Sequence, residues 1–497
     1  MHMNHLRRGD WTVSAMVVVG YAFCLRLLYA KLVELLPEEA YYWNYSRHLD
    51  IGYLDHPPMV AWLIRAGSAA FGDGEFGVRF GALCCGALAA LFVYRLTRNV
   101  FGETSALLAV ALMQALPFFF LSGLLMTPDA PLTAAWAAAL YFLERALIGG
   151  SARAWFGVGI SVGIGLISKY TIGLLGVAAL LFMLLDPPSR RWFRRWEPYA
   201  ALLIAVCVFA PVLIWNAQHQ WASFAFQTSR RLAEAPRFSL HKLVGGAMVL
   251  LTPVGLAAAG IALCGNPGGR AQRLLRVAVL VPLAVFAMFS LRHEVKLDWT
   301  GAPWTAALPL MAGGFAQAAG GGAGRWLRAA WPPTLLTMLL FYGVGLYYLV
   351  VGVPGIGYSR HTELVPVGWR DFGRQVGGIA DGLRAKYGDN LLVVGMDRYA
   401  IASELAFYSN DRARSVASTT SAHLFDGVGL MYERWFPAGR QSGHPLLLVA
   451  WDPADLAEPR LMQRAGGLGP VEEGALMRDG GIVRRYYYRF ARNYEYP

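Results

Sequence analysis

The chain has a loop in which carboxylates, aromatic rings and a histidine stand close together, directly after its first long apolar segment. The loop begins with Pro37-Glu38-Glu39-Ala40-Tyr41-Tyr42-Trp43 and continues with Gly52-Tyr53-Leu54-Asp55-His56-Pro57-Pro58-Met59. A carboxylate can accept a proton from a reacting hydroxyl, and a protonated histidine can bind an anion. The loop therefore offers residue types for acid–base chemistry on a polar group at a membrane surface. Alternatively, its acids are merely solvated and its rings form an interfacial belt.

Further charged residues stand at the ends of apolar segments. Asp129 begins one segment, within Met126-Thr127-Pro128-Asp129-Ala130-Pro131, and Lys169 separates two others. More cationic or potentially cationic residues follow, namely Arg230, Arg231, His293 and Lys296. A carboxylate beside a membrane span is costly to desolvate unless it is paired, so Asp129 needs an explanation. One explanation is that Asp129 caps the helix it begins, and Lys169 could likewise extend its ammonium group to the interface.

The composition is that of a membrane protein. Of 497 residues, 56% are hydrophobic and 15% are charged, whereas soluble domains average about 45–50% apolar and about 25% charged residues. The net charge is +12, but the arginines stand in short loops between apolar runs, which argues against nucleic acid as a partner. The five cysteines lie in or beside apolar runs without zinc-ligand spacing, so we expect packing residues and no disulfide.

Apolar runs that approach the roughly 20 residues of a membrane span predict a polytopic α-helical protein. We expect about eleven transmembrane helices, at residues 12–33, 76–97, 104–122, 130–148, 154–170, 171–186, 198–217, 243–264, 276–291, 301–318 and 330–352. With the N-terminus in the cytoplasm, all the short arginine-rich loops fall on the cytoplasmic side, as the positive-inside rule requires. The opposite, outer side of the membrane then receives the first loop (34–75), Asp129, Lys169, the segments 218–242 and 292–300, and everything after 353.

The C-terminal region differs from the rest. Asp371–Tyr387 and Asp397–Tyr408 have helical spacing, whereas Asn390–Gly395, Leu446–Trp451 and Ile482–Phe490 have the patterns of strands. We therefore expect a transmembrane domain over residues 1–352 and a soluble α/β domain on the outer side over residues 353–497. Within the first loop, Glu39–Leu49 and Met59–Phe71 are expected to form amphipathic helices in the membrane interface.

Together, the polar residues of the outer side suit a reaction on a lipid-linked sugar. Cations there would bind the phosphate through charge-assisted hydrogen bonds and neutralise it as it leaves. A carboxylate could take the proton of an acceptor hydroxyl that attacks the anomeric carbon, with inversion. A divalent metal ion is a further option, since Glu38, Glu39, Asp55, His56 and His293 could bind one, but no spacing requires it and no cofactor is indicated. Taken singly, His56 could belong to a turn, and His293 and Lys296 could be interfacial anchors.

Several of these motifs, in order along residues 30–305, resemble the polyprenyl-phosphate-sugar-dependent glycosyltransferases of the GT-C fold. That class includes the protein O-mannosyltransferases and, more similar to this chain, the lipid A aminoarabinose transferases. The resembling stretches are Pro37–Trp43, Asp55–Met59, Phe71-Gly72 with Arg79, Thr127–Leu132, Ser168–Thr171 and His293–Trp304. The chain departs from the family at Glu38-Glu39, where Asp-Glu is usual, and at His56, where the aminoarabinose transferases have lysine.

The resemblance implies an inverting glycosyltransferase that moves a sugar from a polyprenyl-phosphate donor to a lipid acceptor of the lipid A or lipopolysaccharide type. The periplasmic membrane face is the expected place of the reaction. Glu38 and Asp129 are the expected catalytic pair, with Glu39 as the less favoured neighbour, because adjacent helix residues point about 100° apart. The donor phosphate is expected to contact His56, Lys169, Lys296, His293, Arg230 and Arg231. The substrates are expected to contact Tyr41, Tyr42, Tyr53 and Asp55.

Other functions stay open. A protein O-glycosyltransferase of the same fold would differ in its acceptor, and an oligosaccharide ligase in its longer donor. A flippase for a lipid-linked sugar would need a polar pathway through both leaflets, whereas the polar residues here gather on one side. A scaffold without enzymatic activity would not need Asp129, Lys169 and Lys296 at separate span ends on one face.

Overall fold

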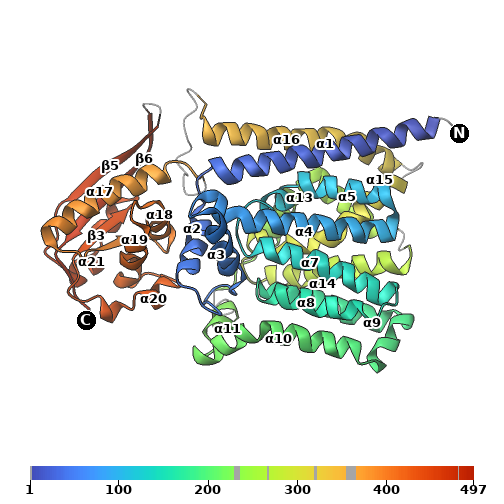
Figure 1. Ribbon diagram of the computed structural model, residues 1–497, viewed down its shortest axis with the longest axis horizontal. Helices are drawn as coiled ribbons and strands as arrows, with labels where there is room; N and C mark the ends of the chain where they lie inside the picture. Colours follow the sequence, from blue (N-terminus) through green and yellow to red (C-terminus); the bar gives the residue numbers. More distant parts are fainter. Residues whose placement is uncertain are drawn as a thin grey trace. The chain divides into compact units, whose positions relative to one another are not determined.

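The computed structural model describes residues 3–228, 235–265, 268–317, 322–353, 365–478 and 481–496. The chain forms two compact units. The first consists of Met1–Ala30, Ile51–Val60 and Arg79–Val344, and the second of Lys31–Asp50, Ala61–Val78 and Gly345–Pro497. The first unit is a bundle of helices, and the second combines helices with a β-sheet (Figure 1).

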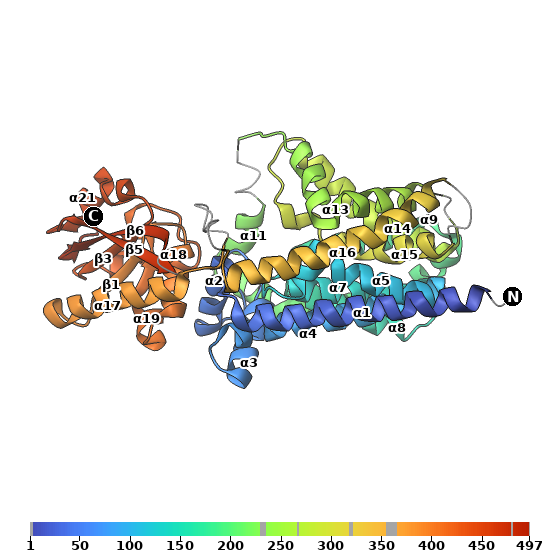
Figure 2. The same cartoon turned by 90° about the horizontal axis from the view of Figure 1, so that it is seen from above.

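Long helices dominate the first unit, and some of them extend into the second unit at one end. The helices are α1 (Met3–Leu32), α4 (Glu75–Phe101), α5 (Glu103–Ala115), α6 (Pro117–Ser122), α7 (Asp129–Leu143), α8 (Ala154–Leu166), α9 (Gly173–Leu185), α10 (Glu197–Gln218), α11 (Ala222–Gln227), α13 (Leu240–Cys264), α14 (Arg270–Ser290), α15 (Ala307–Gln317) and α16 (Gly322–Val350). Helices α1 and α16 lie side by side (Figures 1 and 2), where the Tyr29 hydroxyl donates to the Tyr342 carbonyl at 2.7 Å.

Six of the described helices are long and apolar enough to cross a membrane: α1, α4, α10, α13, α14 and α16. A seventh span results if the bent pair Tyr170–Leu185 and Pro187–Arg194 is counted as one. The prediction of a polytopic α-helical membrane protein is therefore confirmed. The other four expected spans coincide with shorter or interrupted helices, namely α5 with α6, α7 with a π-helical turn at Glu144–Ile148, α8, and α15.

The break between α5 and α6 shows why one expected span, at residues 104–122, is not a single helix. Pro117 has no N–H group to donate, and the residue before it adopts an extended conformation, as residues before proline tend to do. The Tyr342 hydroxyl donates to the carbonyl of Ala115, the last residue of α5, at 2.8 Å. The Arg26 guanidinium donates to the carbonyls of Phe119 and Phe120 in α6 at 2.9 and 3.0 Å. Side chains of other helices thus bond to backbone carbonyls beside the break, which an apolar environment requires.

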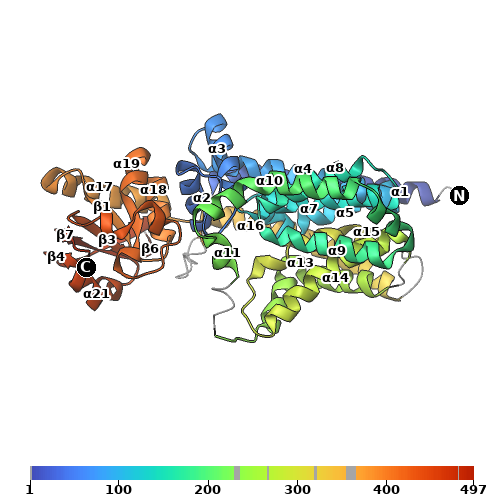
Figure 3. The ribbon, with the colours of Figure 1, turned by 90° about the horizontal axis from the view of Figure 1, so that it is seen from below.

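Close packing of α8 against α10 helps to fix the end of α8, which precedes Lys169. A Cβ atom on Gly159 would lie 2.5 Å from the Ala201 carbonyl oxygen, and one on Gly163 would lie 3.2 Å from the Cα atom of Ala205. Small residues at such positions let two apolar helices approach closely. The two helices run side by side through the bundle (Figures 1 and 3).

The second unit contains a five-stranded sheet with the strand order β2-β1-β3-β6-β5. The strands are β1 (Leu392–Gly395), β2 (Thr419–Ser421), β3 (Leu446–Ala450), β5 (Val471–Arg478) and β6 (Gly481–Ala491). Strand β1 pairs in parallel with β2 and β3, while β6 pairs antiparallel with β3 and β5. A small second sheet pairs β4 (Ala465–Gly466) with β7 (Asn493–Tyr494). The α/β architecture expected for the C-terminal region is present, with β1, β3 and β6 at the three expected strands.

Helices cover both faces of the larger sheet (Figures 2 and 3). One face carries α17 (Trp369–Tyr387), α18 (Ala400–Tyr408) and α19 (Arg412–Ser418), and the other carries α21 (Pro459–Arg464). The core beneath α21 contains the apolar side chains Leu392, Leu446, Leu448 and Leu461, which are at most 4% exposed. A further short helix, α20 (Tyr432–Trp435), follows β2 in the chain.

Most of the first loop belongs to the second unit. The loop contains α2 (Pro37–Arg47) and α3 (Met59–Phe71), and α3 has the predicted bounds. Helix α2 packs on α18, where the rings of Trp43 and Phe407 lie 5.1 Å apart. Glu34 accepts a hydrogen bond from the backbone N–H of Trp369 at 2.7 Å. The compact units thus divide the chain differently from the expected boundary at residues 352 and 353, because the loop packs with the C-terminal region.

Candidate active site

One polar cluster of the first unit consists of the predicted site residues Asp129 and Lys169 together with Asp298. The Lys169 Nζ atom lies 2.9 and 3.0 Å from the two carboxylate oxygens of Asp129 and 2.6 Å from Oδ2 of Asp298. The side chains of Lys169 and Asp129 are 10% and 13% exposed, while that of Asp298 is 44% exposed. One ammonium group therefore sits between two carboxylates, one deeply buried and the other open to its surroundings.

Three separate elements position this cluster. Asp129 is the first residue of α7, and Lys169 lies between the end of α8 and a 3₁₀ turn at Tyr170–Ile172. Lys169 is in an extended conformation, and its backbone N–H donates to the Gly165 carbonyl at 2.8 Å. Asp298 lies in a second 3₁₀ turn, Leu297–Thr300. Short turns at the ends of helices thus bring together residues that are far apart in the sequence.

The contacts of the cluster show whether Asp129 caps its helix and whether Lys169 extends to the membrane interface. The N-cap residue of α7 is Pro128, and no side-chain cap is formed there, so the capping explanation for Asp129 is wrong. Lys169 is 8% exposed, and it binds both carboxylates instead of reaching towards the interface. The sequence predicted both residues as site residues but did not pair them.

Charge and burial set the electrostatics of the cluster. Lys169 places one positive charge between two carboxylates, of which Asp129 is buried and Asp298 is more open. Burial opposes ionisation of Asp298, but the Lys169 ammonium lowers the pKa of this carboxyl well below its usual range. Asp298 is therefore held as a carboxylate that faces the ammonium group.

The segment Ile51–Val60 contributes Tyr53, Asp55 and His56 to the first unit. Gly52 lets this segment pass close to α10, since a Cβ atom there would lie 2.6 Å from the Trp215 ring. The Met59 N–H donates to the Ile167 carbonyl at 3.0 Å, two residues before Lys169. Asp55 is 6% exposed and close enough to Tyr170 to interact with it electrostatically. The structure thus places Asp55 next to the turn that holds Lys169, with His56 half-buried beside it.

The remaining cationic candidates differ in their positions. Lys296 is exposed, two residues before Asp298, and its charge helps to stabilise the Asp298 carboxylate. His293 packs its ring 4.7 Å from that of Phe289, and its Nδ1 atom is buried without a hydrogen-bond partner among the described residues. Arg230 and Arg231 lie outside the residues that the structure describes.

The other predicted site residues belong to the second unit. Glu39 is fully buried, and its Oε2 atom accepts a hydrogen bond from the Leu36 N–H at 3.2 Å, so it caps α2. Glu38 is exposed. The Tyr41 hydroxyl accepts a hydrogen bond from the Met431 N–H at 3.2 Å, and its ring lies 4.7 Å from that of Tyr399. Tyr41, like the neighbouring Tyr42, is buried.

These surroundings separate two kinds of role. Glu39 and Tyr41 hold α2 in place, whereas the exposed Glu38 is accessible to a substrate.

Among the described residues, no three His, Cys, Asp or Glu side chains gather in a way that could hold a metal ion. Asp298 was missed as a site residue, although it stands in the charged loop that the sequence singled out.

Known proteins share both sequence and fold with this chain. The sequence profile of the dolichyl-phosphate-mannose-protein mannosyltransferase family matches residues 55–215. Lipid A galacturonosyltransferase RgtD of Rhizobium johnstonii is 28% identical over 218 residues, which are 41% of this chain and 43% of that protein. An undecaprenyl phosphate-alpha-4-amino-4-deoxy-L-arabinose arabinosyl transferase of Pseudomonas paraeruginosa is 33% identical over 175 residues, 33% of this chain and 31% of that protein.

The solved structure of ArnT from Cupriavidus metallidurans bound to undecaprenyl phosphate matches with a TM-score of 0.62 at 15% identity, over 97% of this chain and 98% of that chain. The chain has the GT-C fold of the aminoarabinose transferases. The fold match extends over nearly the whole chain, whereas the aligned sequence spans less than half the length of these two relatives. Asp55, Asp129 and Lys169 lie inside the region that the family profile matches, and Asp298 lies beyond it.

Proposed function

We propose that the protein is an inverting glycosyltransferase that takes a sugar from a polyprenyl-phosphate donor and transfers it to a lipid acceptor of the lipid A type. The observation that carries the proposal is the buried Lys169 ammonium held between Asp129 and Asp298 at the ends of apolar helices. A fixed cation at such a place suits the phosphate of a lipid carrier. Both relatives are named as sugar transferases, and ArnT has been solved with undecaprenyl phosphate bound, which supports a sugar transfer from a lipid phosphate.

The proposal includes a place in the cell. We assign the protein to a bacterial inner membrane, with about eleven spans and with the reaction on the periplasmic side. The asymmetric arginine distribution supports this orientation, since short positively charged loops stay in the cytoplasm. The second unit, with its α/β sheet, then lies in the periplasm.

In the proposed donor complex, the phosphate takes the place of one carboxylate at Lys169. Asp298 is the carboxylate to be displaced, because its side chain is 44% exposed and that of Asp129 is 13% exposed. Lys296, His56 and His293 are the further candidates for contact with the phosphate. The cations neutralise the phosphate as the bond between the anomeric carbon and the phosphate oxygen breaks, so the leaving group needs no proton.

The acceptor hydroxyl attacks the anomeric carbon from the face opposite to the phosphate, which inverts the anomeric centre. Its proton passes to a carboxylate as the new bond between oxygen and carbon forms. We assign this role to Glu38, which is exposed, and not to Glu39, whose carboxylate caps α2. Asp129 is the partner carboxylate, which either holds the donor sugar or shares the proton.

A protein acceptor is the second candidate, because the matching family profile is described as a protein mannosyltransferase family. Mass spectrometry of lipid A and of surface glycoproteins, from cells with and without the gene, separates the two. The lipid A proposal predicts a species heavier by one sugar residue that depends on the gene and is lost with Lys169→Met. An unchanged lipid A together with a gene-dependent glycoprotein would contradict it.

A further inference from the structure

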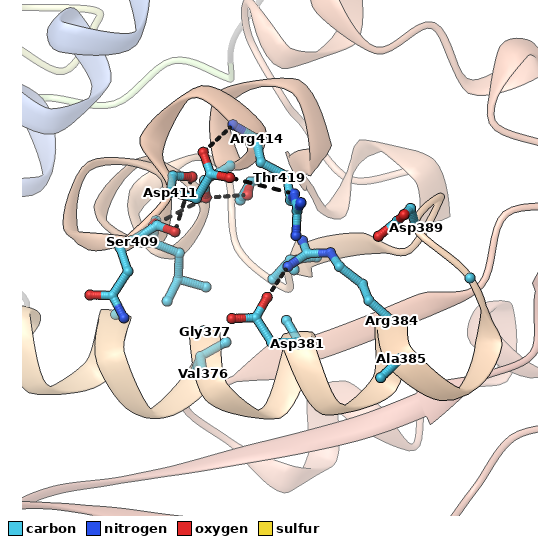
Figure 4. A pocket seen from close by; sticks show the side chains of 17 residues that line it. Val376, Gly377, Asp381, Arg384, Ala385, Asp389, Ser409, Asp411, Arg414 and Thr419 are labelled. Carbon is cyan, nitrogen blue, oxygen red and sulfur yellow. Dashed lines mark hydrogen bonds and ion pairs between the residues drawn. The ribbon is translucent and has the colours of Figure 1, made fainter.

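The C-terminal part of the second unit contains a pocket with a volume of about 610 Å³ that takes no part in the site described above (Figure 4). One wall is α17 with the loop after it. The other wall is formed by α18 and α19, by the loop between them, and by residues of β1 and β2. This volume lies within the range of small-molecule sites, which is about 300–1,000 Å³. The pocket is thus large enough for a ligand of one or two sugar rings.

The pocket wall is rich in charge, but its cations are paired. The charged lining residues are Asp381, Arg384, Asp389, Asp411 and Arg414. Arg384 donates from Nη1 to Oδ1 of Asp381 at 3.0 Å, and the Nε atom of Arg414 lies 3.6 Å from Oδ2 of Asp411. Three carboxylates against two guanidinium groups leave the wall with one excess negative charge. Such a wall disfavours phosphates and acidic sugars and favours ligands that carry many hydrogen-bond donors.

Arg384 is the most firmly held of these groups. Its side chain is only 9% exposed, and its Nη2 atom donates to the Ser418 hydroxyl at 3.2 Å. Its Nε atom is buried and has no hydrogen-bond partner among the described residues. Buried polar atoms without a partner are uncommon and often stand at functional sites. Two hydroxyl groups extend the polar wall nearby, since Oγ of Ser415 lies 3.1 Å from Oγ1 of Thr419.

The geometry points to a saccharide-binding pocket for neutral or amino sugars. Sugar hydroxyls both donate and accept hydrogen bonds, which matches a wall of carboxylates, hydroxyls and guanidinium groups. An ammonium group on the sugar would balance the excess negative charge. The sugar part of the acceptor glycolipid is the occupant we assign, and this assignment, unlike sugar binding itself, rests on the proposed function.

Neighbouring glycines of α17 offer a matched pair of variants. Gly377 lines the pocket and Gly378 does not. A Cβ atom at either position would meet nothing within 4 Å, so both sites accept a side chain. Gly377→Leu places a leucine side chain in the pocket, whereas Gly378→Leu places the same side chain elsewhere on the helix. Both changes replace a helical glycine, so both should alter the stability of α17 in the same direction.

The test measures binding to the full-length protein in detergent by saturation-transfer NMR, with glucosamine, glucose and inorganic phosphate as probes. We expect glucosamine and glucose to bind the wild type and Gly378→Leu equally, and to lose at least tenfold in affinity with Gly377→Leu. No sugar binding by the wild type, or equal binding by both variants, would overturn the pocket. Phosphate binding that Gly377→Leu abolishes would overturn the sugar class.

A transfer assay on the same samples distinguishes this proposal from the proposed function. If the protein transfers no sugar but binds sugars as described, the proposed function fails and the pocket stands. If transfer occurs but Gly377→Leu leaves sugar binding unchanged, the pocket fails and the proposed function stands.

Discussion

Removing the ammonium group of Lys169 is the perturbation whose effect the structure defines best. Lys169→Met keeps most of the side-chain length and eliminates the charge. It also leaves Asp129 and Asp298 facing each other without the cation that now contacts three of their oxygens at 2.6–3.0 Å. The variant should therefore lose both donor affinity and stability, and the two effects must be separated.

Both losses have expected magnitudes. A hydrogen bond to a charged group contributes about 1.5–3 kcal/mol. At about 1.4 kcal/mol per factor of ten, the Kd for the donor phosphate should rise by about 10- to 150-fold. Removing one partner of a buried ion pair costs about 3–5 kcal/mol of stability. The lower end of that range applies here, because the side chain of Asp298 is 44% exposed.

Binding of undecaprenyl phosphate to the purified protein, alongside a thermal unfolding curve, measures both effects. The double variant Lys169→Met/Asp298→Asn is the control, since it removes one unpaired carboxylate. Its stability should recover in part while its donor affinity stays low. Recovery of wild-type affinity in the double variant, or an unchanged Kd in the single variant, would refute the role of Lys169 in phosphate binding.

Four further outcomes are expected. Asp298→Asn should bind undecaprenyl phosphate at least as tightly as the wild type, because the phosphate no longer competes with a carboxylate; a tenfold weaker affinity would show that Asp298 is not displaced. Glu38→Gln should lower kcat by about 10²–10⁴-fold with donor affinity retained, whereas Glu39→Gln should lower the Tm and spare kcat; the opposite pattern would exchange their roles. Asp129→Asn should lower kcat by a similar factor of about 10²–10⁴, and near-wild-type turnover would reject it as a catalytic residue. A reporter that is active only in the periplasm, fused after Pro497, should be active, while activity of a cytoplasmic reporter at that position would reject the topology.

Local patterns predicted the elements well. The helices α3 and α17 and the strand β6 follow from periodicity in the sequence, whereas β1 and β3 follow from short continuous apolar runs, because both faces of these two strands are buried. The interruption of the span at residues 104–122 was missed, although Pro117 stands inside that run. A hydropathy average counts apolar residues, so it does not show that a proline lacks the backbone N–H group that a continuous helix needs.

The site was only partly predictable, for a different reason. Asp129 and Lys169 stood out because charge beside a span is expensive. Asp298 is a charged residue among other charged residues, so its contact with Lys169, 129 positions earlier, has no local signal. Tyr41 illustrates the converse, since an aromatic residue in a polar loop could contact a substrate or pack in a core. Its partners Met431 and Tyr399 lie more than 300 positions away, so only the fold shows that it packs.

The most direct test of the central claim is sugar transfer by the purified protein in liposomes. The liposomes contain polyprenyl-phosphate-linked sugar and lipid A, and mass spectrometry follows both lipids with time. The proposed function predicts that lipid A gains the mass of one sugar residue while free polyprenyl phosphate accumulates in equal amount, and that NMR of the product shows the inverted anomeric configuration. Release of the sugar without a heavier lipid A, or a product with retained configuration, would contradict it.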